Sequence, residues 1–76
     1  MNKKEYLLRK RIERKTNTTN KLQAEISRFA EVLNNLPEDN FAAFCQIIAK
    51  IKKYKTRIEK HNFEKKLMLN ELITRY

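Results

Sequence analysis

Apolar side chains recur along the chain at alternating steps of four and three residues, the spacing of one face of an α-helix in a coiled coil. The first such seam contains Leu8, Ile12, Lys15, Thr19, Leu22, Ile26, Phe29, Leu33 and Leu36. The second contains Phe41, Phe44, Ile48, Ile51, Lys55, Ile58, Asn62, Lys65, Leu69, Leu72 and Tyr76. The pattern predicts two helical arms, each with one largely apolar face.

Between the two seams lies a short segment, residues 36–40, that contains the only proline of the chain, Pro37. Proline disfavours helix at the residue before it and suits the first turn of a new helix. A turn here would fold the arms back on each other, so that residue i faces residue 77 − i and seam positions meet seam positions. The sequence therefore predicts an all-α antiparallel helical hairpin, a single domain over residues 1–76.

Polar residues interrupt the pattern in the middle of each arm. Residues 16–20 are Thr and Asn, whose side chains compete for backbone hydrogen bonds and favour helix ends. His61 and Asn62 form a similar signal on the second arm. These signals favour two helices in each arm, and the pattern leaves open whether the arms are continuous or bent at these levels. The predicted helices span residues 3–15, 20–35, 38–60 and 62–76.

Several large apolar side chains fall outside both seams, and a lone hairpin would leave them in water. Ile47 and Tyr54 are seven residues apart beside the second seam, a spacing that suits a bundle built from two hairpins. We therefore expect a homodimer. The side chains predicted at the dimer or partner interface are Ile47, Tyr54, Phe63 and Leu67.

Composition adds a strong positive charge, because 18 Lys and Arg side chains oppose 9 Asp and Glu, which gives a formal net charge of +9. The excess is concentrated in residues 1–15 and 50–66, two blocks that a hairpin would place toward its open half. Rows of cations on a helix suit phosphate binding, since each neutralised phosphate releases counterions. The candidate nucleic-acid-binding residues are Lys3, Lys10, Arg11, Arg14, Lys50, Lys53, Arg57 and Lys60.

The composition argues against catalysis and metal binding. The chain has 76 residues, no glycine, one histidine and one cysteine. It therefore lacks a glycine-rich phosphate loop, a zinc ligand set and a Cys-His pair with an orienting third group. We expect no enzyme, no cofactor and no metal site, and we interpret Cys45 as a small apolar side chain of the core. No apolar stretch approaches the ~20 residues of a membrane span, so we expect a cytoplasmic protein.

Two functions agree with these features. The first is a small non-enzymatic regulatory protein that binds nucleic acid, DNA in particular, through its backbone phosphates. The alternative is a helical adaptor that docks an apolar helix face on a host protein, with its basic residues steering it to an acidic surface. Nuclease treatment separates the two, because it should dissolve complexes only under the first. Peripheral membrane binding by a basic amphipathic helix is the weaker third hypothesis, since the seam residues are needed for folding.

Overall fold

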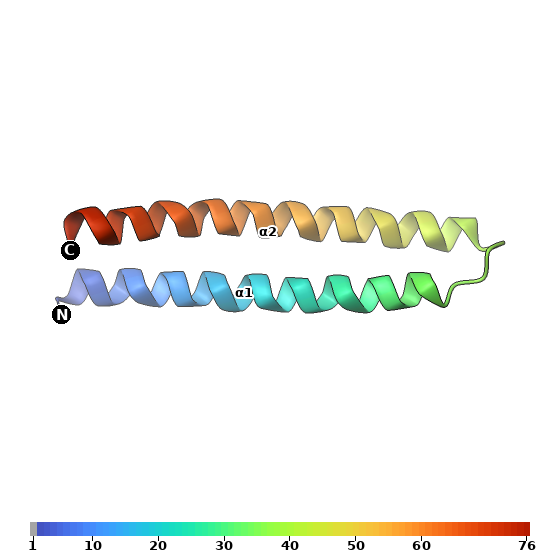
Figure 1. Cartoon of the computed structure of the whole chain (residues 1–76), viewed down its shortest axis with the longest axis horizontal. Helices are drawn as coiled ribbons and strands as arrows, with labels where there is room; N and C mark the ends of the chain where they lie inside the picture. Colours follow the sequence, from blue (N-terminus) through green and yellow to red (C-terminus); the bar gives the residue numbers. More distant parts are fainter. Residues whose placement is uncertain (1) are drawn as a thin grey trace.

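The computed structural model describes residues 2–76 and shows two long helices joined by a short loop (Figure 1). Helix α1 spans Lys3–Asn34 and helix α2 spans Phe41–Arg75. The helices lie antiparallel, with both chain termini at one end, the open end, and the loop at the other, the closed end (Figure 1). The molecule measures 58 × 14 × 12 Å. The predicted all-α antiparallel hairpin is confirmed.

Asparagine side chains begin both helices. The Asn2 Oδ1 accepts a hydrogen bond from the Glu5 amide at 2.8 Å, and the Asn40 Oδ1 accepts one from the Ala43 amide at 3.4 Å. The Asn40 amide in turn donates to the Pro37 carbonyl at 3.1 Å, which closes a separate turn ahead of α2. The sequence predicts that this helix starts at residue 38. It starts three residues later because asparagine, rather than proline, supplies the helix cap.

Both helices are continuous, so the predicted breaks at residues 16–20 and 61–62 are wrong. The Thr16 hydroxyl donates to the Ile12 carbonyl at 3.1 Å, and the Thr19 hydroxyl donates to the Thr16 carbonyl at 2.9 Å. These hydroxyls bond to carbonyls of their own helix and leave the backbone ladder intact, instead of capping a new helix. The four predicted helices therefore merge into two.

The seam predicted on the first arm is the face of α1 that packs against α2. All nine of its positions are buried or half-buried. Leu8 and Ile26 are the most enclosed, each with 8% of its surface exposed, and they are the only buried apolar side chains among residues 2–76. The hairpin therefore has a thin core that is one layer of side chains deep.

The inward face of α2 differs from the predicted seam at every second position. Ile51 and Ile58 lie against α1 as predicted. Ile48, Lys65 and Leu72 are also half-buried as predicted. At three positions, however, the half-buried residue is the one before the predicted residue: Tyr54, His61 and Met68 replace Lys55, Asn62 and Leu69. Tyr54 is held there by aromatic packing on Phe29 of α1, with ring centroids 5.6 Å apart.

The displaced register leaves much of the predicted second seam in solvent. The seam members that are exposed are Phe41, Phe44, Lys55, Asn62, Leu69 and Tyr76. Cys45 is exposed as well, so its interpretation as a core side chain is wrong. A polar Lys55 or Asn62 gains nothing from facing α1, whereas the rings of Tyr54 and His61 bury carbon there.

Candidate nucleic-acid interface

A groove runs between α1 and α2 along one flank of the hairpin. It consists of two adjoining hollows of about 410 and 540 Å³, whose shared lining comes from Lys15, Thr18, His61 and Glu64. Four of the eight candidate binding residues complete its walls, two from each of the charged blocks of the sequence. They are Arg11 and Arg14 of α1 and Arg57 and Lys60 of α2. We call this surface the basic groove.

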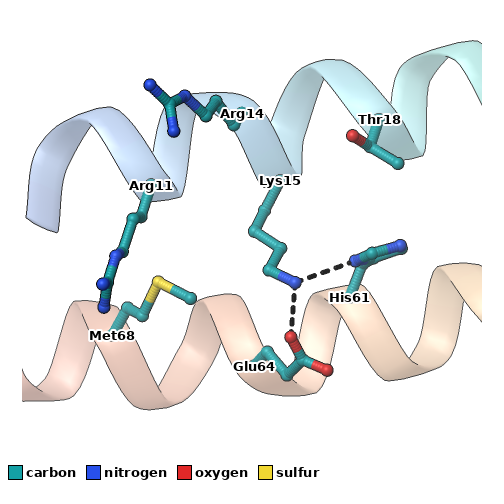
Figure 2. Close-up of a pocket in the computed structure, with 7 residues that line it drawn as sticks. All are labelled: Arg11, Arg14, Lys15, Thr18, His61, Glu64 and Met68. Carbon is teal, nitrogen blue, oxygen red and sulfur yellow. Dashed lines mark hydrogen bonds and ion pairs between the residues drawn. The ribbon is translucent and has the colours of Figure 1, made fainter.

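The floor of the basic groove is built around Lys15, a position that interrupts the first apolar seam. Its side chain crosses from α1 to α2 and ends between His61 and Glu64 (Figure 2). The Lys15 ammonium forms an ion pair with the Glu64 carboxylate and lies 3.1 Å from Nδ1 of His61. An ammonium can only donate, so Nδ1 is on the acceptor side of this contact. The polar layer is thus internally satisfied.

The cations on the walls are not neutralised by carboxylates. Among residues 2–76 no ion pair involves Arg11, Arg14, Arg57 or Lys60. Figure 2 shows Arg11 extending across the groove toward Met68 of α2, while Arg14 turns away from α2. Arg57 lies 5.7 Å from the centre of the Tyr54 ring, a contact that orients the guanidinium without cancelling its charge.

The remaining candidate residues lie outside the groove. Lys50 and Lys53 are exposed on α2. With Arg57 and Lys60 they form a basic stripe on α2 that extends from the groove toward the closed end. The Lys50 ammonium lies 5.8 Å from the centre of the Phe29 ring. Lys10 is partly neutralised by Glu13 at 3.3 Å. Lys3 is exposed in the first turn of α1. The structure therefore extends the groove by a stripe on α2 and leaves Lys3 and Lys10 apart from it.

Three further basic residues join this flank without being predicted. Lys15 forms the floor described above, and Lys4 and Arg75 line a third hollow at the open end together with Arg11. Lys4 is seven residues before Arg11, and Lys15 is four residues after it. That spacing places Lys4, Arg11 and Lys15 along one side of α1, a signal that the sequence already contained, whereas Arg75 belongs to α2.

Charge is separated along the axis of the hairpin. Residues 29–49 contain no Lys or Arg and carry the three carboxylates of Glu31, Glu38 and Asp39. Because the side chain of Lys50 contacts Phe29, these residues together form the closed end. The closed end is therefore acidic, and the whole positive excess belongs to the rest of the molecule.

The four side chains predicted at a dimer or partner interface are separated by the fold. Ile47 and Tyr54 are half-buried, and Tyr54 packs on α1. Phe63 and Leu67 are 63% and 56% exposed and line a shallow apolar hollow on α2 with Leu69 and Ile73. They do not form one continuous apolar surface with the first two.

Residues 2–76 contain no group of three His, Cys, Asp or Glu side chains that could hold a metal ion. Within the same range, neither helix has a stretch long and apolar enough to cross a membrane. Comparison of the chain with protein-family models, curated proteins and solved structures finds no match. The function must therefore be argued from the geometry and charge of the basic groove.

The Glu64 carboxylate gives the hairpin a specific pH dependence. A hydrogen bond from Lys15 holds the pKa of Glu64 below its ordinary value, with the charges of Lys15 and Lys60 acting in the same direction and partial desolvation opposing them. The stabilisation is present above the usual Glu pKa of about 4.3 and is lost as the pH falls through the lowered folded-state value. We expect Glu64→Gln to flatten the fall in melting temperature below about pH 5.

The matched control for this measurement is Glu59→Gln, an exposed position that forms no ion pair among the described residues. Circular dichroism melts across the acid range should show the control following the unmodified protein. Identical pH profiles for all three proteins would show that the Lys15–Glu64 pair does not contribute to stability.

Proposed function

We propose that this protein is a small non-enzymatic regulatory protein that binds nucleic acid, DNA in particular, through the backbone phosphates. The observation that carries the proposal is the basic groove. Its walls contain Arg11, Arg14, Arg57 and Lys60, none of which forms an ion pair among the described residues. Such a surface gains affinity with each phosphate that it contacts, because counterions are released. Nucleic-acid binding also agrees with the cytoplasmic location that the sequence predicts.

The dimensions of the basic surface suit a duplex backbone. From Lys50 to Lys60 the stripe on α2 covers about 15 Å at the helical rise, the length of about four base-pair steps. A straight, rigid helix holds these cations in a fixed row, so less side-chain and backbone freedom is lost on binding. Guanidinium groups at Arg11 and Arg57 add bidentate contacts to phosphate oxygens.

The geometry favours nucleic acid over the adaptor hypothesis. That hypothesis uses the apolar side chains Ile47, Tyr54, Phe63 and Leu67 as one docking face. Ile47 and Tyr54 are half-buried in the hairpin itself, so only Phe63 and Leu67 remain fully available to a host protein. The basic groove, by contrast, is open along its length.

The test is the salt dependence of binding to several duplexes of unrelated sequence. Binding through phosphates lowers log K linearly with log salt, with a slope of about −0.9 for each phosphate contacted. If the four cations of the groove walls each contact one phosphate, the slope should be about −3.6 or steeper, and similar for every duplex. Fluorescence anisotropy across a range of salt concentrations measures it. Absence of binding at low salt, or an affinity that does not change with salt, would contradict the proposal.

A further inference from the structure

The hairpin exposes more surface than a folded chain of its size should. Its accessible surface is 6275 Å² for a mass of 9.2 kDa. A compact monomer of that mass exposes about 4,900 Å², so the excess is about 1,300 Å² per chain. Two copies together have an excess of roughly 2,600 Å², which is more than a standard protein–protein interface buries. The open surface is therefore large enough for a second copy to cover.

One part of this surface is a second apolar stripe on α2, beside the face that packs on α1. We call it the outer stripe. It consists of the side chains Phe41, Phe44, Ile48, Lys55, Asn62, Leu69 and Ile73. Ile48 is half-buried, and the others are exposed, with Phe41 71%, Phe44 44% and Ile73 78% exposed. The stripe is apolar at both ends of the helix and polar in the middle.

Between Phe44 and Ile73, the apolar and polar positions of the outer stripe have the same spacing in both directions. Phe44 and Ile73 lie equally far from its centre, as do Ile48 and Leu69, and as do Lys55 and Asn62. An antiparallel copy of the same helix would therefore set apolar side chains against apolar ones and polar against polar. A two-fold dimer requires this kind of self-complementary surface.

We propose that a second copy of this chain covers the outer stripe, with α2 packed antiparallel on α2. Phe44 then meets Ile73 of the partner subunit, and Ile48 meets Leu69 of the partner subunit. Lys55 lies beside Asn62 of the partner subunit, and such a polar pair in an apolar seam fixes the register at some cost in stability. The assembly is a four-helix bundle in which the α2 helices are central.

The charge separation within each hairpin selects the antiparallel arrangement. The closed end, residues 29–49, carries three carboxylates and no Lys or Arg, whereas residues 1–15 at the open end are strongly basic. Antiparallel packing places each closed end beside the open end of the partner, so opposite charges approach. Parallel packing would place the two acidic ends together and the two basic ends together.

This dimer leaves the basic groove accessible. Neither hollow of the groove is lined by a member of the outer stripe. Around the axis of α2, the inward positions Tyr54 and His61 separate two sides of the helix. Arg57 and Lys60 lie on the groove side, and the outer stripe lies on the opposite side. The proposal can therefore be tested in the absence of nucleic acid, and it stands or falls independently of the proposed function.

The first experiment is sedimentation of the full chain at about 100 μM, where a specific dimer of modest affinity is populated. We expect twice the chain mass of 9.2 kDa. The double variant Phe44→Glu with Ile73→Glu should sediment as a monomer with its helicity retained, because both side chains face solvent in the hairpin. The control, Tyr6→Glu with Val32→Glu, adds the same charge at exposed positions of α1, away from the stripe, and should remain dimeric.

Disulfide capture tests the register and remains informative if a glutamate variant unfolds. In a Cys45→Ser background, chains with Phe44→Cys are mixed with chains with Ile73→Cys and oxidised gently. The antiparallel register predicts linked dimers in the mixture only, because the two copies of position 44 would lie about 44 Å apart at the helical rise. Any one of three results would overturn the proposal. The unmodified protein is a monomer, only the Tyr6 and Val32 substitutions give a monomer, or the Phe44→Cys chain links to itself as efficiently as in the mixture.

Discussion

Neutralising Arg11 and Arg57 together should weaken binding to any DNA duplex by about tenfold at low salt, and should lower the steepness of the salt dependence by about 1.8. The two guanidiniums come from opposite walls of the basic groove and form no ion pair among the described residues. Each guanidinium can therefore neutralise one phosphate. Removal of both contacts makes the slope of log K against log salt shallower by about 0.9 for each phosphate that is no longer neutralised. Anisotropy titrations of the variant Arg11→Gln with Arg57→Gln, at several salt concentrations, measure both effects.

The matched control is Lys52→Gln with Lys66→Gln, which removes the same charge from exposed positions that line neither hollow of the groove. Only the long-range field changes in this control, so its affinity should fall less and its salt slope should stay near that of the unmodified protein. Thermal melts of both variants confirm the fold, since Arg57 contacts the Tyr54 ring. Equal losses in both variants would show that the groove has no particular role.

A single aspartate at Ile26 should unfold the hairpin at room temperature. Ile26 is one of the two buried apolar side chains of the described chain. The substitution Ile26→Asp removes its apolar contacts and places a carboxylate where nothing pairs with it, at a cost of at least about 4 kcal/mol. A chain of this length has a total stability of roughly 4–11 kcal/mol. Far-ultraviolet circular dichroism should therefore show loss of most of the helical signal.

Val32→Asp provides the comparison for this loss. Val32 is also a β-branched apolar residue of α1, but 47% of its surface is exposed. Its replacement should leave a helical protein with a cooperative melt, because the carboxylate remains in water. If the Ile26→Asp protein also melts cooperatively near the original temperature, the Ile26 layer is not the centre of the core.

The sequence was sufficient to predict the hairpin, the loop and the inward face of α1. On α1 a single seam from Leu8 to Leu33 has the required spacing, with only Lys15 and Thr19 polar, so this face is the one to bury. Continuity of the helices was not predicted, because the preference of Thr and Asn for helix ends was given more weight than packing. In the structure the hydroxyls of Thr16 and Thr19 bond within α1, and the helix is kept by its contacts with α2.

The inward face of α2 was harder to predict because two heptad registers are possible on this helix, and both contain Ile51, Ile58 and Leu72. Over residues 51–72 the register that contains Tyr54 and Met68 has one more apolar position than the predicted register, but over the whole of α2 it has no more. The candidate site was predicted in part. The basic blocks were identified, but the sequence could not show that Arg11 and Arg57 flank one groove or that Lys15 pairs with Glu64, since these contacts join residues of different helices.

By itself the sequence determined that this protein is a helical hairpin with a basic open half and an acidic closed end, because periodicity and charge are properties of the chain. Only the tertiary structure decided which stripe of α2 faces α1. That choice depends on how the Tyr54 ring packs against Phe29 across the interface. The same choice brings the basic groove together on one flank and leaves the outer stripe exposed, since turning α2 about its axis moves every side chain on it at once.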